Sequence, residues 1–273
     1  MLPNHYLYRN ETMDLPPIVD AHRLPAAPET ADDFAVLLAA RGVQRTVLVQ
    51  PEPSAVATDA ALDAADSDPL VAAAAVWADV TSRGLGKTLR QLERNRKLRG
   101  LCLPACKEPD NHWLTQPAVL KGLREVAQRG LSLDVIVEPR QVSSVRDLAE
   151  AVPDLRIAVA HIGSPFIARS EREPWGVHML NLAPCPNVWV KVSGLVTLDT
   201  EPWSAAHLRL FVEPMVRLFG YRRMMFGSDW PNHVSVASYE QVLDAAIEAA
   251  GPMTDAQLAE VLGGTAAAFY RLG

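Results

Sequence analysis

Asp229 is the residue that the sequence marks most clearly for chemistry. It follows an apolar run, residues 223–227, that predicts a buried strand, and Trp230 and Pro231 come next. An unpartnered buried carboxylate is costly, and catalytic groups of parallel α/β proteins collect where strands end. The structural alternative is an aspartate that caps the following helix. We expect Asp229 to be a functional carboxylate.

Polar side chains also follow two other strand-like runs. Asp20 and His22 come directly after residues 17–19, and His161 comes directly after residues 157–160. A carboxylate can take a proton from water, and an imidazole can polarise a carbonyl or exchange a proton near neutral pH. We therefore predict that Asp229, His161 and His22 are the catalytic residues of one shared site.

The elements that must position these residues repeat along the chain as a short apolar run followed by a longer helical pattern. Helical patterns such as residues 30–41 and 117–129 end before Gly42 and Gly130, as helix C-termini commonly do. The strand-like runs span residues 17–20, 45–50, 70–77, 98–103, 131–137, 156–161, 187–192 and 222–227.

Strands alternating with helices predict a parallel sheet, and eight such units predict a (β/α)8 TIM barrel. A doubly wound open sheet is the rival, but no glycine-rich phosphate-binding turn follows the first strand. We place an N-terminal arm at residues 1–16 and a single barrel domain at residues 17–273, with a closing helix at residues 263–272.

The amino-acid composition and net charge limit the kinds of binding partner that we expect. The chain has 273 residues, 49% of them hydrophobic, and a net charge of -6 without a basic run, which argues against nucleic acid and anionic membranes. It begins without a signal-like pattern, and its three cysteines suit a reducing compartment, with Cys102 as core filler. We predict a cytoplasmic enzyme with a small-molecule substrate, and a homo-oligomer stays open.

Four motifs occur in an order and spacing that resemble the amidohydrolase superfamily, above all its lactonase group. That group includes fuconolactonases, sulfomuconolactone lactonases and pyrone-dicarboxylate lactonases. The resemblance implies the barrel fold and hydrolysis of a lactone, and it covers the chain from residue 17 onward. The motifs are Asp20-Ala21-His22, His161-Ile162-Gly163-Ser164-Pro165, residues 187–195 and Phe226-Gly227-Ser228-Asp229-Trp230-Pro231.

The first motif departs from the family pattern. Relatives usually carry Asp-x-His-x-His there, whereas this chain has Leu24 at the second histidine position. Two histidines two residues apart on a strand can hold one metal ion, which a single histidine cannot do alone. The fifth strand also offers Asp134 and no histidine. We predict no metal or other cofactor; the alternative is a single zinc or other divalent ion at His22, His161 and Asp229.

The predicted mechanism uses Asp229 as general base toward water. His161 would polarise the lactone or orient the water, and His22 would hold the carbonyl or fix Asp229. Lys107, Arg140 and Arg169 follow strand ends, as does Arg172, and this favours an anionic substrate because arginine pairs with carboxylates. The remaining predicted substrate contacts are Asp20, Arg23, Asp134, Ser193 and Trp230, the last as a pocket wall.

Two alternatives stand beside this metal-independent lactonase. The missing histidine is compatible with a non-hydrolytic barrel enzyme, such as a cyclase, isomerase or decarboxylase. A non-catalytic ligand-binding barrel is less favoured because the acid–base residues Asp229 and His161 are present. One orientation also stays undecided: Lys191 and Ser193 share a face of their strand, and sequence does not say whether that face is the barrel interior.

Overall fold

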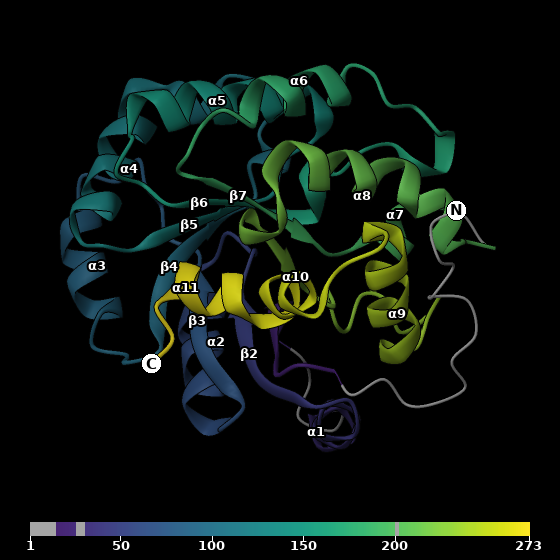
Figure 1. The fold of residues 1–273 in the computed structure, drawn as a ribbon. Coiled ribbons are helices and arrows are strands. Elements are labelled where there is room, and N and C mark those ends of the chain that lie inside the picture. Colours follow the sequence, from purple (N-terminus) through teal and green to yellow (C-terminus); the bar gives the residue numbers. More distant parts are fainter. Residues whose placement is uncertain (1–14, 26–30, 200–201) are drawn as a thin grey trace.

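The computed structural model describes residues 15–25, 31–199 and 202–273, and these form an eight-stranded parallel barrel surrounded by helices (Figure 1). The sheet order is β1 to β8 in sequence order, which confirms the predicted (β/α)8 fold. The strands are β1 (Ile18–Arg23), β2 (Val43–Val49), β3 (Val71–Val76), β4 (Leu98–Leu103), β5 (Ser132–Val135), β6 (Ile157–Val159), β7 (Val188–Val192) and β8 (Met224–Phe226).

The barrel closes where β8 returns to β1. The backbone N–H of Asp229 donates to the carbonyl of His22 at 2.8 Å, and that of Leu24 donates to the carbonyl of Trp230 at 2.8 Å. Closure therefore occurs at the C-terminal strand ends, between the two segments that carry the first and last predicted catalytic residues.

The helices cover the outside of the barrel, and several of them begin at side-chain caps. Ser54 accepts a hydrogen bond from the N–H of Ala57, and Ser238 forms a capping box with Gln241. The helices predicted at residues 30–41 and 117–129 appear as α1 and α4, although Thr30 lies outside the described residues, as does most of the predicted arm. The helices are α1 (Ala31–Ala40), α2 (Ala55–Ser67), α3 (Leu85–Leu92), α4 (Pro117–Gln128), α5 (Val142–Ala151), α6 (Trp175–Leu182), α7 (Leu195–Leu198), α8 (Ala205–Phe219), α9 (Tyr239–Ala250), α10 (Asp255–Ala259) and α11 (Thr265–Tyr270).

Small apolar residues fill the inside of the barrel. The residues buried there include Ala21, Ala73, Ala75 and Ala158. Cys102 is buried in the same cluster, as predicted for a small core residue. The C-terminal helix α11 adds Phe269 and Tyr270 to the same inner cluster. Polar side chains on the inner face therefore stand out against an otherwise apolar lining.

A tight turn brings the C-terminal segment against β1. Residues 260–264 form one π-helical turn, and a Cβ at Gly263 would lie 2.5 Å from the carbonyl oxygen of Pro17. Only glycine allows this approach, which sets α11 against the barrel and confirms the closing helix expected at residues 263–272.

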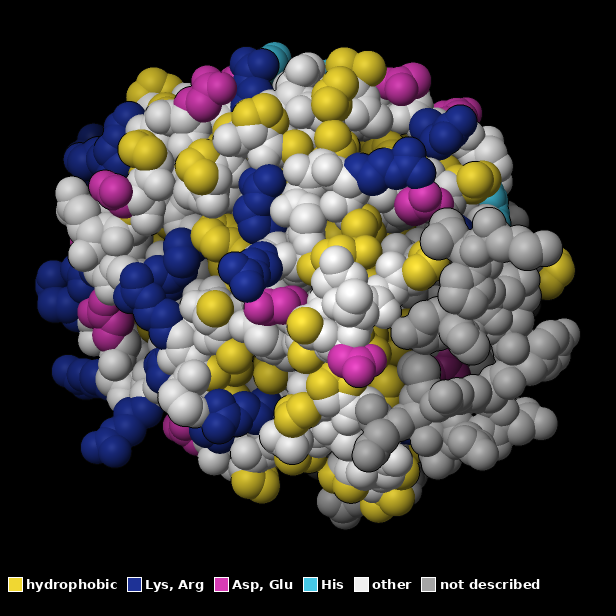
Figure 2. Space-filling model, in the orientation of Figure 1, with side chains coloured by type: hydrophobic (Ala, Val, Ile, Leu, Met, Phe, Trp, Pro, Cys, Tyr) yellow, Lys and Arg dark blue, Asp and Glu magenta, His cyan; other side chains and the backbone are white. Residues whose placement is uncertain are grey.

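The outer surface mixes charges of both signs. On the face drawn in Figure 2, lysine and arginine side chains are spread among acidic and hydrophobic ones rather than gathered in one patch. Within the described part of the chain, no helix is both long and apolar enough to cross a membrane.

Candidate active site

The Asp229 carboxylate lies at the C-terminal mouth of the barrel, at the junction between β8 and β1. The residue is 3% exposed and adopts a left-handed backbone conformation, with φ of 62°. The Asn232 side-chain amide donates to its two carboxylate oxygens at 3.3 and 3.4 Å. The next helix, α9, has Ser238 as its N-cap, so the helix-capping alternative for Asp229 is wrong.

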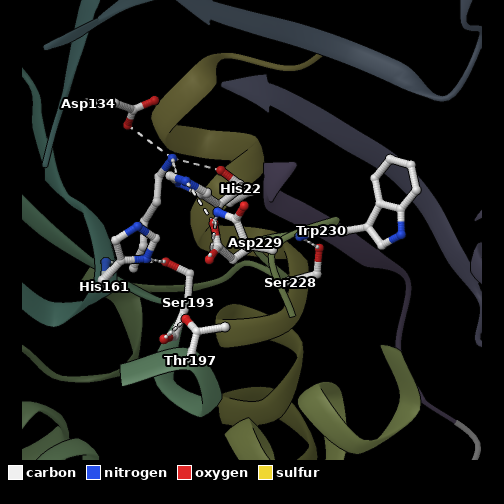
Figure 3. A network of polar contacts seen from close by, with 12 residues as sticks. His22, Asp134, His161, Ser193, Thr197, Ser228, Asp229 and Trp230 are labelled. Atoms are coloured by element: carbon white, nitrogen blue, oxygen red, sulfur yellow. Dashed lines mark hydrogen bonds and ion pairs between the residues drawn. The ribbon is translucent and has the colours of Figure 1, made fainter. Parts of the chain in front are cut away.

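His22 and His161 face this carboxylate (Figure 3). His22 Nε2 lies 3.7 Å from Asp229 Oδ1, and the rings of His22 and His161 meet edge to face with centroids 4.8 Å apart. One nitrogen of each histidine and one oxygen of Asp229 all lie within 4.8 Å of one another. The structure thus brings together all three residues predicted to be catalytic.

Ser193 and Gly194, directly after β7, position His161. The Ser193 hydroxyl accepts from the His161 backbone N–H at 3.2 Å and lies 3.0 Å from ring atom Nδ1. Gly194 has φ of 65°, and a Cβ there would meet His161 Nδ1 at 2.5 Å. Ser193, predicted to contact substrate, is 2% exposed and holds the backbone and the ring of His161.

A column of polar groups runs inside the barrel beneath His22. Lys191, undecided in the sequence, points inward: its ammonium donates to the carbonyl of Ala21 at 2.7 Å, pairs with Asp134 Oδ1 at 3.1 Å and lies 3.5 Å from His22 Nδ1. Tyr270 of α11 donates to the two oxygens of Asp134 at 2.7 and 2.8 Å. Lys191 and Asp134 are fully buried, so Asp134, predicted to contact substrate, is engaged here by Lys191 and Tyr270.

Burial shifts the pKa values of two ionisable groups in the site. It raises the pKa of Asp229 above 3.8, an effect that His161 opposes. Burial lowers the pKa of His22 well below 6.5, with Lys191 and His161 acting in the same direction. His22 is therefore neutral at neutral pH, and Asp229 holds a proton more readily than an exposed aspartate.

Two ring nitrogens of the site have no hydrogen-bond partner among the described residues. They are Nε2 of His22 and Nε2 of His233, and both are buried. His233, four residues after Asp229, turns its Nδ1 to the carbonyl of Ala237 at 2.9 Å. Unpaired buried polar atoms are rare in folded proteins, so both nitrogens are candidates for contact with a bound molecule.

Asp20 lies behind the site. Its carboxylate accepts from the backbone N–H groups of His22 at 3.1 Å and Ser228 at 2.9 Å, and from the Tyr239 hydroxyl at 3.3 Å. It is fully buried and ties β1 to the loop after β8. Tyr239 and Tyr270 were not predicted, because nothing in the local sequence shows that helices α9 and α11 bring them to buried carboxylates.

The other predicted substrate contacts lie nearer the rim or in the packing. Arg23 forms an ion pair with Asp68 at 2.5 Å, and its guanidinium lies over the ring of Trp230, which is 4% exposed. The basic residues follow β4, β5 and β6 on the surface; Arg140 pairs with Glu138 at 2.6 Å, and Arg169 lies 4.0 Å from Glu171. Direct substrate contact by Arg23, Trp230, Lys107, Arg140 and Arg169 stays a prediction.

The chain is similar to known proteins over nearly its whole length. The amidohydrolase family profile matches residues 4–272. The chain belongs to the amidohydrolase family. The resemblance seen in the four sequence motifs is thus confirmed.

Two curated relatives are similar over most of their lengths. An L-fucono-1,5-lactonase from Burkholderia ambifaria is 36% identical over 254 residues, which are 88% of this chain and 84% of the relative. An L-fucono-1,5-lactonase from Burkholderia multivorans is 26% identical and covers 98% of this chain and 95% of its own. A crystal structure of an amidohydrolase from B. multivorans with bound zinc is 25% identical, with a TM-score of 0.86 over 94% of this chain and 100% of its own.

Proposed function

We propose that this amidohydrolase opens the lactone ring of a small substrate with Asp229 as general base and without a metal ion. The observation that carries the proposal is the buried Asp229 carboxylate, with its raised pKa, facing two imidazoles at the barrel mouth. The B. ambifaria relative, a sugar lactonase at 36% identity, supports the substrate class.

The side chains can divide the steps of hydrolysis among themselves. Asp229 takes a proton from water as the water oxygen adds to the lactone carbonyl carbon. A neutral imidazole donates to the oxyanion that forms. The ring C–O bond then breaks, and the leaving alkoxide receives the proton held by Asp229, either directly or through His161, which gives up one proton and takes that of Asp229 in return. The products are the open hydroxy acid and the original protonation state of the enzyme.

Lys191 determines which nitrogen of His22 carries the proton. An ammonium group only donates hydrogen bonds, so His22 Nδ1, 3.5 Å away, accepts. Because His22 is neutral, its proton resides on Nε2, which faces Asp229 Oδ1 and has no hydrogen-bond partner in the part of the chain that the structure describes. His22 is thereby placed to donate from Nε2 to a carbonyl oxygen or to Asp229.

The same tautomer bears on the metal question. The amidohydrolase from B. multivorans was crystallised with zinc, and here one nitrogen each of His22 and His161 and one oxygen of Asp229 lie within 4.8 Å of one another. A metal-binding histidine needs its lone pair toward the ion and normally donates its other N–H to a carboxylate or carbonyl. At His22 that other nitrogen faces an ammonium, and Leu24 stands where a second histidine would be. The donor set fits a metal poorly, and we propose no step through one.

The predicted anionic substrate rests on the basic residues beyond the strand ends, whereas the relatives are named for a sugar lactone. A panel of lactones distinguishes an anionic substrate from a neutral one. We would measure acid release from L-fucono-1,5-lactone, other neutral aldonolactones and carboxylated lactones, using protein treated with a chelator. Selective turnover of carboxylated lactones would support the anionic class, and turnover of neutral lactones alone would contradict it.

Two variants complete the test. Asp229→Asn should lose turnover, whereas Asp154→Asn, an exposed aspartate before β6, should keep it. Hydrolysis of none of these lactones would overturn the proposal. So would full activity of Asp229→Asn, or activity that disappears with the metal and returns with zinc.

A further inference from the structure

A second group of catalytic residue types lies in the loops near the barrel mouth. Ser170 Oγ is 3.0 Å from His207 Nε2, and His207 Nδ1 is 2.9 Å from Asp199 Oδ2. Ser170 follows the short helix Ile167–Arg169 in the β6–α6 connection, Asp199 follows α7, and His207 lies in the first turn of α8. These residues are separate from Asp229, His161 and His22.

The hydrogen-bond roles in this group follow from its chemistry. An ionised carboxylate only accepts, so His207 carries its proton on Nδ1 toward Asp199. Nε2 then presents a lone pair to Ser170, whose hydroxyl donates to it. In enzymes that use covalent catalysis, the nucleophile is typically hydrogen-bonded to a base, and a third group orients that base.

The base and its carboxylate are held firmly. The Asp199 side chain is 1% exposed, and that of His207 is 26% exposed. The His207 ring packs edge to face on Phe211 with centroids 6.1 Å apart, and its backbone N–H donates to Ser204 Oγ at 3.2 Å. The imidazole is therefore fixed between the buried carboxylate and the surface.

Ser170 itself is exposed and adopts a left-handed backbone conformation, with φ of 54°. Its N–H donates to the carbonyl of Ile167 at 2.7 Å, and that of Glu171 donates to Phe166 at 3.3 Å, so neither amide is available to an oxyanion. The Arg172 side chain is exposed and, among the described residues, makes no hydrogen bond or ion pair. It lines a groove of about 600 Å³ between α6 and α8, which Glu171, Trp175, Leu180 and Met215 also line.

We propose that Ser170 is a second nucleophile of this chain, activated by His207 and Asp199, and that it accepts acyl groups from small activated carboxylic esters. Ser170 Oγ adds to the ester carbonyl while its proton passes to His207 Nε2. The ester C–O bond then breaks, the alcohol leaves with that proton, and an acyl-serine remains. With a fluorophosphonate the P–F bond breaks instead, and fluoride and the proton leave.

The expected reactivity is modest. Preorganised backbone donors to an oxyanion typically contribute about 10²- to 10³-fold in rate, and the amides of Ser170 and Glu171 already donate to other carbonyls. Acyl transfer to Ser170 should therefore be slow.

The test is covalent labelling of the purified chain with a fluorophosphonate, read by intact mass and peptide mapping. One adduct on Ser170 is expected, with none in Ser170→Ala. His207→Gln should label about 10²-fold or more slowly, since it removes the general base. Ser164→Ala is the matched control, because Ser164 lies in the same loop with φ of 49°, and it should label at the parent rate.

Labelling of Asp229→Asn separates this site from the proposed lactonase site. It should proceed at the parent rate, so the nucleophile proposal stands or fails independently of lactone hydrolysis. An adduct on Ser193, which contacts His161, would overturn the proposal. So would the absence of any adduct, or equal rates for the parent and His207→Gln.

Discussion

Lys191 offers the sharpest test of how the active site is organised. If its ammonium holds His22 with the proton on Nε2, replacing it by a neutral residue should release that tautomer and make His22 a better metal ligand. Lys191→Met alone would leave the Asp134 charge buried, with Tyr270 as its remaining hydrogen-bond partner among the described residues. Breaking a buried pair in this way typically costs about 3–5 kcal/mol of stability. The double variant K191M/D134N removes both charges and avoids that cost.

The size of the effect follows from the contact. Hydrogen bonds to charged groups contribute about 1.5–3 kcal/mol, and at 3.5 Å the contact between Lys191 and His22 belongs at the lower end of that range. A bias of about 1.5 kcal/mol corresponds to roughly tenfold in the tautomer equilibrium. The dissociation constant for zinc should therefore fall by up to about tenfold in K191M/D134N.

Two measurements check this. Nitrogen-15 NMR of the imidazoles, with His22 assigned by its loss in His22→Gln, should show the proton on Nε2 in the parent and a shift toward Nδ1 in K191M/D134N. Calorimetric titration with zinc should show the gain in affinity. Tyr270→Phe is the control, because it keeps the ion pair and should leave both results unchanged. A parent His22 protonated on Nδ1, or unchanged zinc affinity in K191M/D134N, would refute the reasoning.

Four further predictions concern Asp229 and Leu24. Asp229→Asn should lower kcat about 10²- to 10⁴-fold, the range of general-base catalysis, and steady-state kinetics would contradict this if the parent rate persists. Because burial raises the pKa of native Asp229 above its unfolded value near 3.8, kcat should fall as pH decreases through that raised pKa, which a pH–rate profile measures. The raised pKa also means that the native state binds the Asp229 proton more tightly than the unfolded state does. Protonation of Asp229 therefore stabilises the fold at low pH, and this stabilisation is lost as pH rises through the native pKa. At pH 7 Asp229→Asn should melt no lower than the parent, which calorimetry measures. Finally, Leu24→His restores the paired histidines and should tighten zinc binding relative to the parent; a titration showing no change would mean that the two imidazoles do not share an ion.

The sequence by itself determined the fold and the meeting of the three residues predicted to be catalytic. The alternation of apolar runs with helical patterns predicted all eight strands. This succeeds because the spacing of apolar residues along a short segment reflects which of its side chains are buried. Polar residues at strand ends predicted that His22, His161 and Asp229 meet, since parallel strands of a barrel all end at one mouth. The observed distances among these three side chains agree with that expectation.

Tertiary structure decided what surrounds the trio. The two faces of a strand are equivalent in sequence until barrel closure defines an inside, so only the fold shows that Lys191 points to the axis. The register of β1 shifts between Asp20 and Arg23, which lets His22 reach that axis although Ala21 also lies in the inner cluster.

Long-range partners were equally beyond local pattern. Tyr270 meets Asp134 from 136 residues away, and Ser170 meets His207 across 37 residues and between different connections of the barrel. Such pairs depend on where helices and loops dock after the strands have closed. Docking is set by packing of the whole core, and no short stretch of sequence records it.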